Sequence, residues 1–82
     1  MNTQEVILIL LDEGFEFNEE KKIFHISLND SQDNFIASIL DNSKEVILGA
    51  KCTKGKDIMF LSYNTTREQF MSSFRNFMYR SL

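Results

Sequence analysis

The first apolar segment of the chain has the spacing of a helix. Thr3 is suited to the N-cap, and Gly14 stands where a glycine commonly ends a helix. The apolar positions between them recur at helical intervals: Val6, Ile7, Leu10 and Leu11. We therefore expect a helix here. A strand across residues 5–11 that turns at residues 12–14 is the alternative, because the run is rich in branched residues.

The segment FEFNEEKKIFHISL, residues 15–28, has the alternation of a β-hairpin. A four-residue loop at Asn18–Lys21 would set Phe17 opposite Lys22 and Phe15 opposite Phe24. Period-two alternation then gathers five apolar side chains on one face: Phe15, Phe17, Phe24, Ile26 and Leu28. A register that sorts the apolar residues to one side supports the hairpin.

A short amphipathic helix is predicted in NDSQDNFIASILDNS, residues 29–43. Asp30 or Ser31 would be its N-cap, and Asp41-Asn42-Ser43 would end it. Its apolar stripe would consist of Phe35, Ile36, Ile39 and Leu40.

A second hairpin is predicted in KEVILGAKCTKGKDIMFLSYN, residues 44–64. A three-residue turn at Thr53-Lys54-Gly55, with Gly55 left-handed, sets Cys52 opposite Lys56 and Lys51 opposite Asp57. One face would then hold Val46, Leu48, Ala50, Ile58 and Phe60, and the other Ile47, Met59, Leu61 and Tyr63. Both faces are apolar, so either the fold covers the second face or that face is kept for a partner.

The last segment, residues 65–82, predicts an amphipathic helix. Thr65 and Glu68 have the spacing of a capping box. One stripe holds the large apolar side chains: Phe70, Met71, Phe74, Phe77 and Met78. A helix lying on a membrane surface shows a similar stripe but a denser basic face than the arginines here provide. We expect this helix to cover a sheet face as part of the core.

These elements predict a single α+β domain over residues 1–82, with the order α-β-β-α-β-β-α. Its four-stranded, mainly antiparallel sheet would be packed with three helices. The longest apolar run, residues 6–11, is far shorter than the roughly 20 residues of a membrane span, and no basic region precedes it. With Cys52 as the only cysteine, no intrachain disulfide can form. We expect a cytoplasmic protein without a membrane span.

No residue pattern of the chain indicates an enzyme. His25 is the only histidine and is predicted in a strand, away from any evident nucleophile. One histidine and one cysteine are too few for a common zinc site, and no calcium-loop pattern is present. We therefore expect no catalytic residue, no metal and no cofactor.

The charge of the chain argues against general binding of nucleic acid. The net charge is −3 and the pI is about 5.0. The charge is uneven, however: residues 1–43 hold nine acidic and two basic residues, net −7, and residues 44–82 hold three and seven, net +4. A nucleic-acid-binding or transcription-regulating protein, using the C-terminal arginines with Lys51, Lys54 and Lys56, is the alternative function.

Over its whole length the chain resembles the rIII lysis-inhibition accessory proteins of T-even bacteriophages. The resemblance is carried by the size, by the abundance of Asn, Lys, Ile and Phe, and by the opening MNTQEVILILLDEGFEFNEEKKIF. It implies a non-enzymatic antiholin-type protein in the host cytoplasm that binds the cytoplasmic part of the phage holin and delays lysis. The acidic N-terminal half is suited to receive a basic segment of such a partner.

The predicted contact surface combines one face of the second hairpin with the exposed edge of the last helix. It consists of Ile47, Met59, Leu61, Tyr63, Arg75, Tyr79 and Arg80. Self-association through the apolar face of the second hairpin is a further hypothesis, which makes the protein a homo-oligomer.

Overall fold

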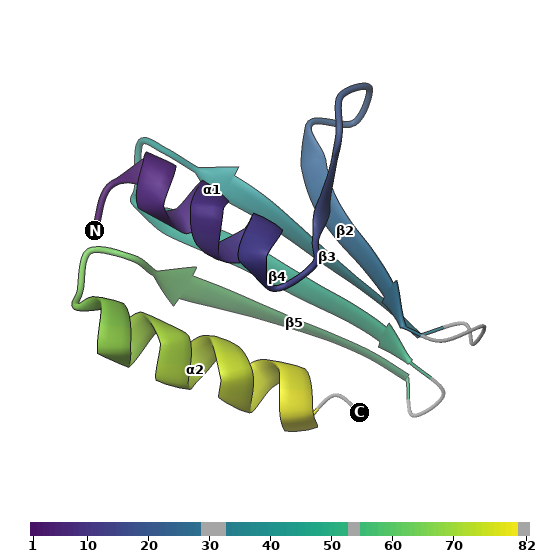
Figure 1. The fold of residues 1–82 in the computed structure, drawn as a ribbon. Coiled ribbons are helices and arrows are strands. Elements are labelled where there is room, and N and C mark those ends of the chain that lie inside the picture. Colours follow the sequence, from purple (N-terminus) through teal and green to yellow (C-terminus); the bar gives the residue numbers. More distant parts are fainter. Residues whose placement is uncertain (29–32, 53–54, 81–82) are drawn as a thin grey trace.

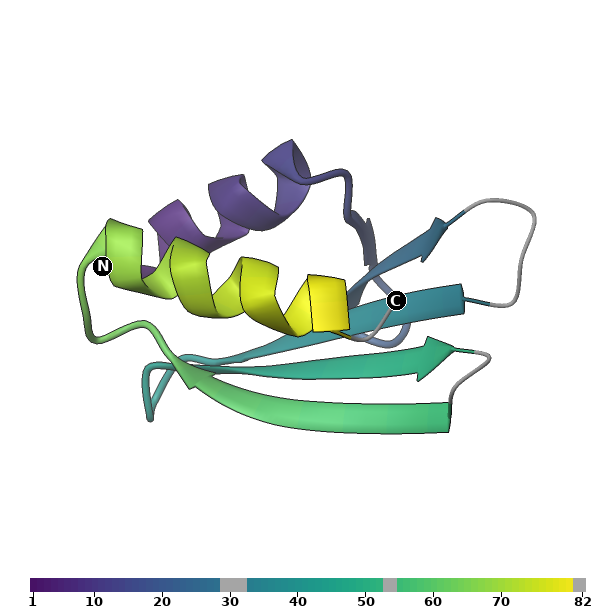
Figure 2. The same cartoon turned by 90° about the horizontal axis from the view of Figure 1, so that it is seen from below.

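Two helices lie on one face of a five-stranded antiparallel sheet in the computed structural model, which describes residues 1–28, 33–52 and 55–80 (Figures 1 and 2). The elements in chain order are α1 (Thr3–Asp12), β1 (Glu16–Asn18), β2 (Ile23–Leu28), β3 (Asp33–Leu40), β4 (Glu45–Cys52), β5 (Gly55–Ser62) and α2 (Arg67–Arg80). Each strand pairs with the next one along the chain, in the order β1-β2-β3-β4-β5. The α+β class is confirmed, whereas the prediction of four strands and three helices is wrong.

The N-terminal helix α1 is confirmed, but its N-cap lies one residue before the predicted Thr3. Asn2 is the N-cap: its side chain accepts from the Glu5 backbone N–H, and Glu5 accepts from the Asn2 N–H. At the other end, Gly14 has φ +97°, which a residue with a side chain adopts rarely. The N–H groups of Gly14 and Phe15 donate to the carbonyls of Leu11 and Leu10, which is the Schellman pattern.

The segment predicted as a second helix is strand β3, at the centre of the sheet. Phe35 and Ala37 are buried beneath the helices, while Ile36 points to the other side. A strand that is apolar on both faces can imitate a helical stripe, because its apolar residues follow one another without a clear period. The segment forms a strand because it pairs with β2 on one side and with β4 on the other. The proposed N-caps Asp30 and Ser31 lie outside the described residues.

The first hairpin is confirmed, but its pairing differs from the predicted one by two residues. Phe17 lies opposite Phe24, and Asn18 lies opposite Ile23. The Asn18 side chain accepts from the Lys21 N–H, and Lys22 has φ 58°. The loop therefore has four residues as predicted, but it is residues 19–22, one position later along the chain. A shift of two residues keeps every side chain on its predicted face. Phe15 and Phe24 are accordingly buried, while Phe17 lies at the exposed edge.

In the second hairpin the pairing differs by one residue. Cys52 lies opposite Gly55, Lys51 opposite Lys56 and Ala50 opposite Asp57, so the predicted pairs are wrong. The connection is two residues long, and those residues, Thr53 and Lys54, lie outside the described part of the chain. A shift of one residue moves every side chain of one strand to the opposite face. Residues of β5 that were predicted to face one side therefore face the other.

The predicted core role of the last helix is confirmed. Phe70, Phe74 and Phe77 are each no more than 1% exposed, and Met71 and Met78 pack beside them. The Phe74 ring lies 6.0 Å from the Phe15 ring. The N-cap is Thr66, whose hydroxyl accepts from the Gln69 backbone N–H, so the predicted cap at Thr65 is wrong by one residue.

A polar chain closes the core where α1 meets the end of β5. Tyr63 is fully buried, and its hydroxyl lies 2.8 Å from the Thr3 hydroxyl. Thr3 in turn donates to the Asp41 carboxylate, so its oxygen is left to accept from Tyr63. This hydrogen bond from Thr3, and then the charge of Lys44 at 3.6 Å, hold the pKa of Asp41 below its usual value.

Candidate interaction surface

The face of the sheet opposite the helices, here called the open face, is not covered by any described element (Figure 2). Strand pairing arranges its side chains in four rows across β3, β4 and β5. From one end to the other, these are Asn34–Lys51–Lys56, Ile36–Gly49–Ile58, Ser38–Ile47–Phe60 and Leu40–Glu45–Ser62. The two middle rows are apolar apart from Ser38, and the two outer rows carry the charges.

The middle rows contain four large apolar side chains, Ile36, Ile47, Ile58 and Phe60, which we call the open-face patch. Ile58 is 63% exposed, Phe60 59% and Ile36 42%, and Ile47 is half-buried between them. Three exposed apolar residues grouped on β3 and β5, on either side of Ile47 on β4, are unusual on a protein that has no partner, because burying them would be favourable.

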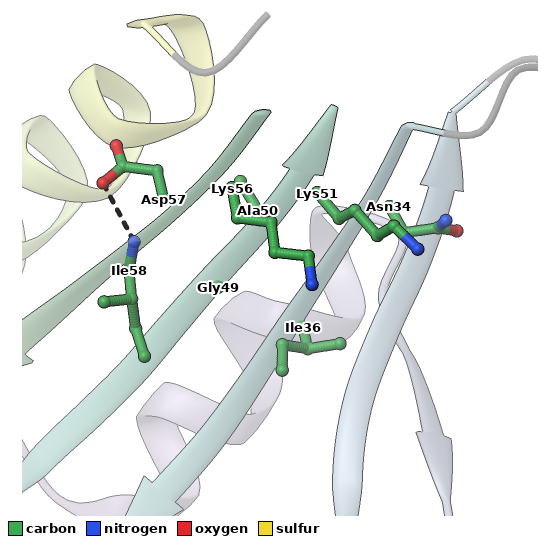
Figure 3. A pocket seen from close by; sticks show the side chains of 8 residues that line it. All are labelled: Asn34, Ile36, Gly49, Ala50, Lys51, Lys56, Asp57 and Ile58. Atoms are coloured by element: carbon green, nitrogen blue, oxygen red, sulfur yellow. Dashed lines mark hydrogen bonds between the residues drawn. The ribbon is translucent and has the colours of Figure 1, made fainter. Parts of the chain in front are cut away.

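A shallow hollow of about 530 Å³ lies at one end of this patch. Ile36 and Ile58 flank it on β3 and β5, with Gly49 between them on β4 (Figure 3). A Cβ atom at Gly49 would lie 2.9 Å from Cγ1 of Ile36, so Ile36 leans over the glycine. Glycine at this position therefore lets the Ile36 side chain pack against the β4 backbone and leaves the hollow open.

Charges stand at the two ends of the open face. Lys51 and Lys56 are directly opposite each other at one end, where like charges repel. Neither forms an ion pair with a carboxylate of the described residues, and Glu45 at the other end has no ion pair with a described cation. The open face is thus apolar in the middle, basic at one end and acidic at the other.

The exposed edge of the sheet, strand β5, is protected against pairing with another strand. The Asp57 carboxylate accepts from the Ile58 backbone N–H at 2.9 Å, so one outward-facing donor is already satisfied (Figure 3). Arg80 of α2 lies 3.2 Å from the same carboxylate and holds it beside the strand. Charged side chains that cover an edge in this way discourage strand addition. The broad face, rather than the edge, is the accessible surface.

The structure divides the predicted contact residues between the two sides of the molecule. Ile47 lies on the open face. Leu61 is 7% exposed and Tyr63 is fully buried under the helices, while Met59 is half-buried beside α2. The prediction that these three share a face with Ile47 is therefore wrong.

The predicted residues of α2 lie in the helical layer. Arg75 pairs with Glu13, and Arg80 pairs with Asp57 and contacts the sulfur of Met59. Tyr79 is 74% exposed. These three residues do not border the open face. The residues that do, Ile36, Ile58 and Phe60, were assigned to a helix or to the covered face. A connection of two residues between Cys52 and Gly55, in place of the predicted three-residue turn, would have placed Ile58 and Phe60 correctly.

The residues considered for chemistry do not come together. His25 is half-buried on β2, opposite Ile36. The side chain of Cys52 is outside the described part of the structure. Within residues 1–28, 33–52 and 55–80, no three His, Cys, Asp or Glu side chains are grouped so as to hold a metal ion. Neither described helix has the length and apolar character needed to cross a bilayer.

The basic residues of the alternative function are also separated. Lys51 and Lys56 lie on the open face, Lys54 is outside the described residues, and Arg67, Arg75 and Arg80 belong to α2 in the other layer. Two of these arginines are already paired with carboxylates. The basic residues that the structure describes therefore form no continuous surface of the kind that follows a phosphate backbone.

No protein-family model, no curated protein and no solved structure matches this chain.

Proposed function

We propose that this protein acts by binding another protein through its open face, without chemistry of its own. The observation that carries the proposal is the open-face patch: four large apolar side chains on three adjacent strands, with no described element over them. Apolar patches of this kind commonly mark protein interaction sites. The side chains stand on a sheet braced by two helices, so the surface is formed before a partner arrives.

In its specific form, the proposal is that the partner is the cytoplasmic segment of a phage holin. The protein would then be a lysis-inhibition accessory, or co-antiholin, that works in the host cytoplasm and delays lysis. The resemblance of the opening of the chain supports this form. The charge pattern also supports it, because the exposed carboxylates of the hairpin of β1 and β2, Glu16, Glu19 and Glu20, outnumber its exposed lysines, Lys21 and Lys22. A basic stretch of the partner could lie along that hairpin while apolar residues cover the patch.

The test is direct binding of a synthetic peptide with the sequence of the holin's cytoplasmic segment, measured by calorimetry. We expect the double variant Ile58→Thr/Phe60→Thr to weaken binding by at least about tenfold, since it removes two central apolar contacts. Threonine keeps the strand preference of both positions. The matched control is Leu8→Gln, which changes an equally exposed apolar residue on α1, 56% exposed, in the other layer.

Two results would contradict the proposal in different ways. Absence of binding by the unchanged protein would reject the holin as partner. Equal binding by the double variant and the control would reject the open face as the contact surface. Far-UV circular dichroism of all variants establishes that the fold is retained.

A further inference from the structure

We infer that a second copy of this chain covers the open face in the free protein, forming a face-to-face homodimer. The two-fold axis would lie between the two sheets and cross the strands at right angles. The inference rests on the proposed function in one respect: both assign binding to the same face. A partner would therefore have to displace the second copy, so that dimerisation regulates access to the site.

The order of the four rows is what selects a second copy as occupant. An axis that crosses the strands between the two middle rows exchanges those rows and also exchanges the two outer rows. The row Ile36–Gly49–Ile58 of one copy then faces the row Ser38–Ile47–Phe60 of the other. The surface is complementary to its own image under this rotation.

The shapes of the middle rows fit each other in this arrangement. Ile47 of one copy lies over Gly49 of the other, where the missing side chain leaves room above the strand. Phe60 lies over Ile58 and reaches the hollow that Ile58 borders. Each contact occurs twice because of the symmetry. Ile47 thus faces a glycine and Ile36 faces Ser38, while Phe60 meets Ile58 beside the hollow, so that most large side chains face small positions as they do between two packed sheets.

The charges of the outer rows agree with the same axis. Lys51 of one copy lies over the strand position of Glu45 in the other, and Lys56 lies beside it. Packed sheets are rotated by about 30°, which moves the outer rows sideways by about one strand, a distance that lysine and glutamate side chains can span. An axis parallel to the strands would instead put Lys51 and Lys56 over the same lysines of the other copy. Charge therefore excludes that axis and favours the one crossing the strands.

The size of the open face is adequate for such a dimer. The four strands β2 to β5, about 4.8 Å apart and six to eight residues long at about 3.3 Å per residue, give a projected area of roughly 480 Å². Two such faces bury on the order of 1,000 Å² or more, which reaches the lower limit of specific interfaces. We therefore expect a dimer that dissociates on dilution rather than a permanent one. The protected edge at Asp57 and Ile58 argues against the other route, pairing of two β5 strands into one sheet.

The experiment is sedimentation equilibrium of the full chain over a wide concentration range, with charge-swap variants. The unchanged protein should form dimers as its concentration rises. Glu45→Lys alone should raise the dissociation constant by roughly tenfold or more, because the symmetry creates two like-charge contacts. Lys51→Glu alone should weaken the dimer in the same direction. The double variant E45K/K51E exchanges the charges and should restore association, which the axis parallel to the strands does not predict. Glu20→Lys, the same charge change on the exposed tip of the first hairpin, is the matched control.

A protein that stays monomeric at all concentrations would overturn the inference. A dimer that is insensitive to Glu45→Lys would also overturn it, as would a double variant that remains as weak as the single ones. These results are separable from those on the proposed function. A monomer that still loses peptide binding on changing Ile58 and Phe60 would leave the proposed function standing. A charge-dependent dimer that binds no holin peptide would leave only the dimer.

Discussion

The two faces of the sheet are built from the same strands, but their side chains have different roles. On the covered face, the alternate residues of β3 and β4 are uncharged and buried: Phe35, Ala37, Val46, Leu48 and Ala50. On the open face, apolar residues alternate along the same strands with Ser38, Glu45 and Lys51. The helices cover the face with the larger set of apolar side chains. Covering the open face would also bury Glu45 and Lys51, and burying an unpaired Glu or Lys would cost more than the apolar contacts return. Apolar content alone therefore does not identify the core. The charged residues that interrupt the apolar pattern of the other face do.

The largest expected effect distinguishes two phenylalanines on these two sides. Phe74→Ala should destabilise the fold by about 3–5 kcal/mol, because it leaves a cavity among side chains that are almost fully buried. That is a large part of the stability of a small domain, about 5–15 kcal/mol. Phe60→Ala should change stability by no more than about 0.5 kcal/mol, as expected for an exposed site. Urea unfolding at a concentration where the protein is monomeric measures both. Similar losses from the two variants would mean that the open face is part of the core.

A smaller effect is expected at the polar margin of the covered face, which consists of Thr3, Asp41 and Tyr63. Tyr63→Phe keeps the ring in the core but removes the hydroxyl that lies 2.8 Å from Thr3. We expect a loss of about 0.5–1.5 kcal/mol, the usual contribution of one hydrogen bond. Tyr79→Phe is the control, since that ring is exposed. Thermal unfolding of both variants compares them, and an unchanged midpoint for Tyr63→Phe would show that the hydroxyl makes no net contribution.

The different outcomes of the two hairpin predictions explain how far the sequence could define these faces. In the first hairpin the register error was two residues, and the buried positions of Phe15 and Phe24 were still correct. In the second the error was one residue, and Leu61 and Tyr63 moved from a supposed contact surface into the core. The period of a strand is two, so an odd error reverses the faces and an even error does not. The length of the turn decides whether the register is shifted by an odd or an even number of residues. The sequence of residues 53–55 is compatible with more than one turn length.

The helices were predictable for a different reason. The stripes of α1 and α2 repeat over several turns, and both ends of α1 carry strong capping residues, Asn2 and Gly14. The segment of β3 is also rich in apolar residues, but its helical spacing extends over only about two turns. Its conformation is determined by pairing with β2 and β4. Long-range pairing is not visible in a local window. The open-face patch was missed for both reasons: Ile36 was assigned to a helix, and the register error of one residue turned Ile58 and Phe60 to the covered face.

The smallest effect concerns Asp41, at the exposed end of the same polar margin. Its pKa is lowered in the folded protein by the hydrogen bond from Thr3 and by Lys44. A carboxyl group whose folded pKa lies below its unfolded value contributes stability that is fully present above the unfolded value, about 3.9, and is lost as the pH falls through the folded value. Asp41→Asn keeps the shape but does not titrate. We therefore expect the difference in unfolding free energy between the unchanged protein and Asp41→Asn to be constant near neutral pH and to shrink below about pH 4. Because other carboxyl groups titrate in both proteins, the difference, not either curve alone, isolates Asp41. A difference that stays constant down to low pH would mean that Thr3 and Lys44 do not favour the charged form of Asp41 in the folded protein.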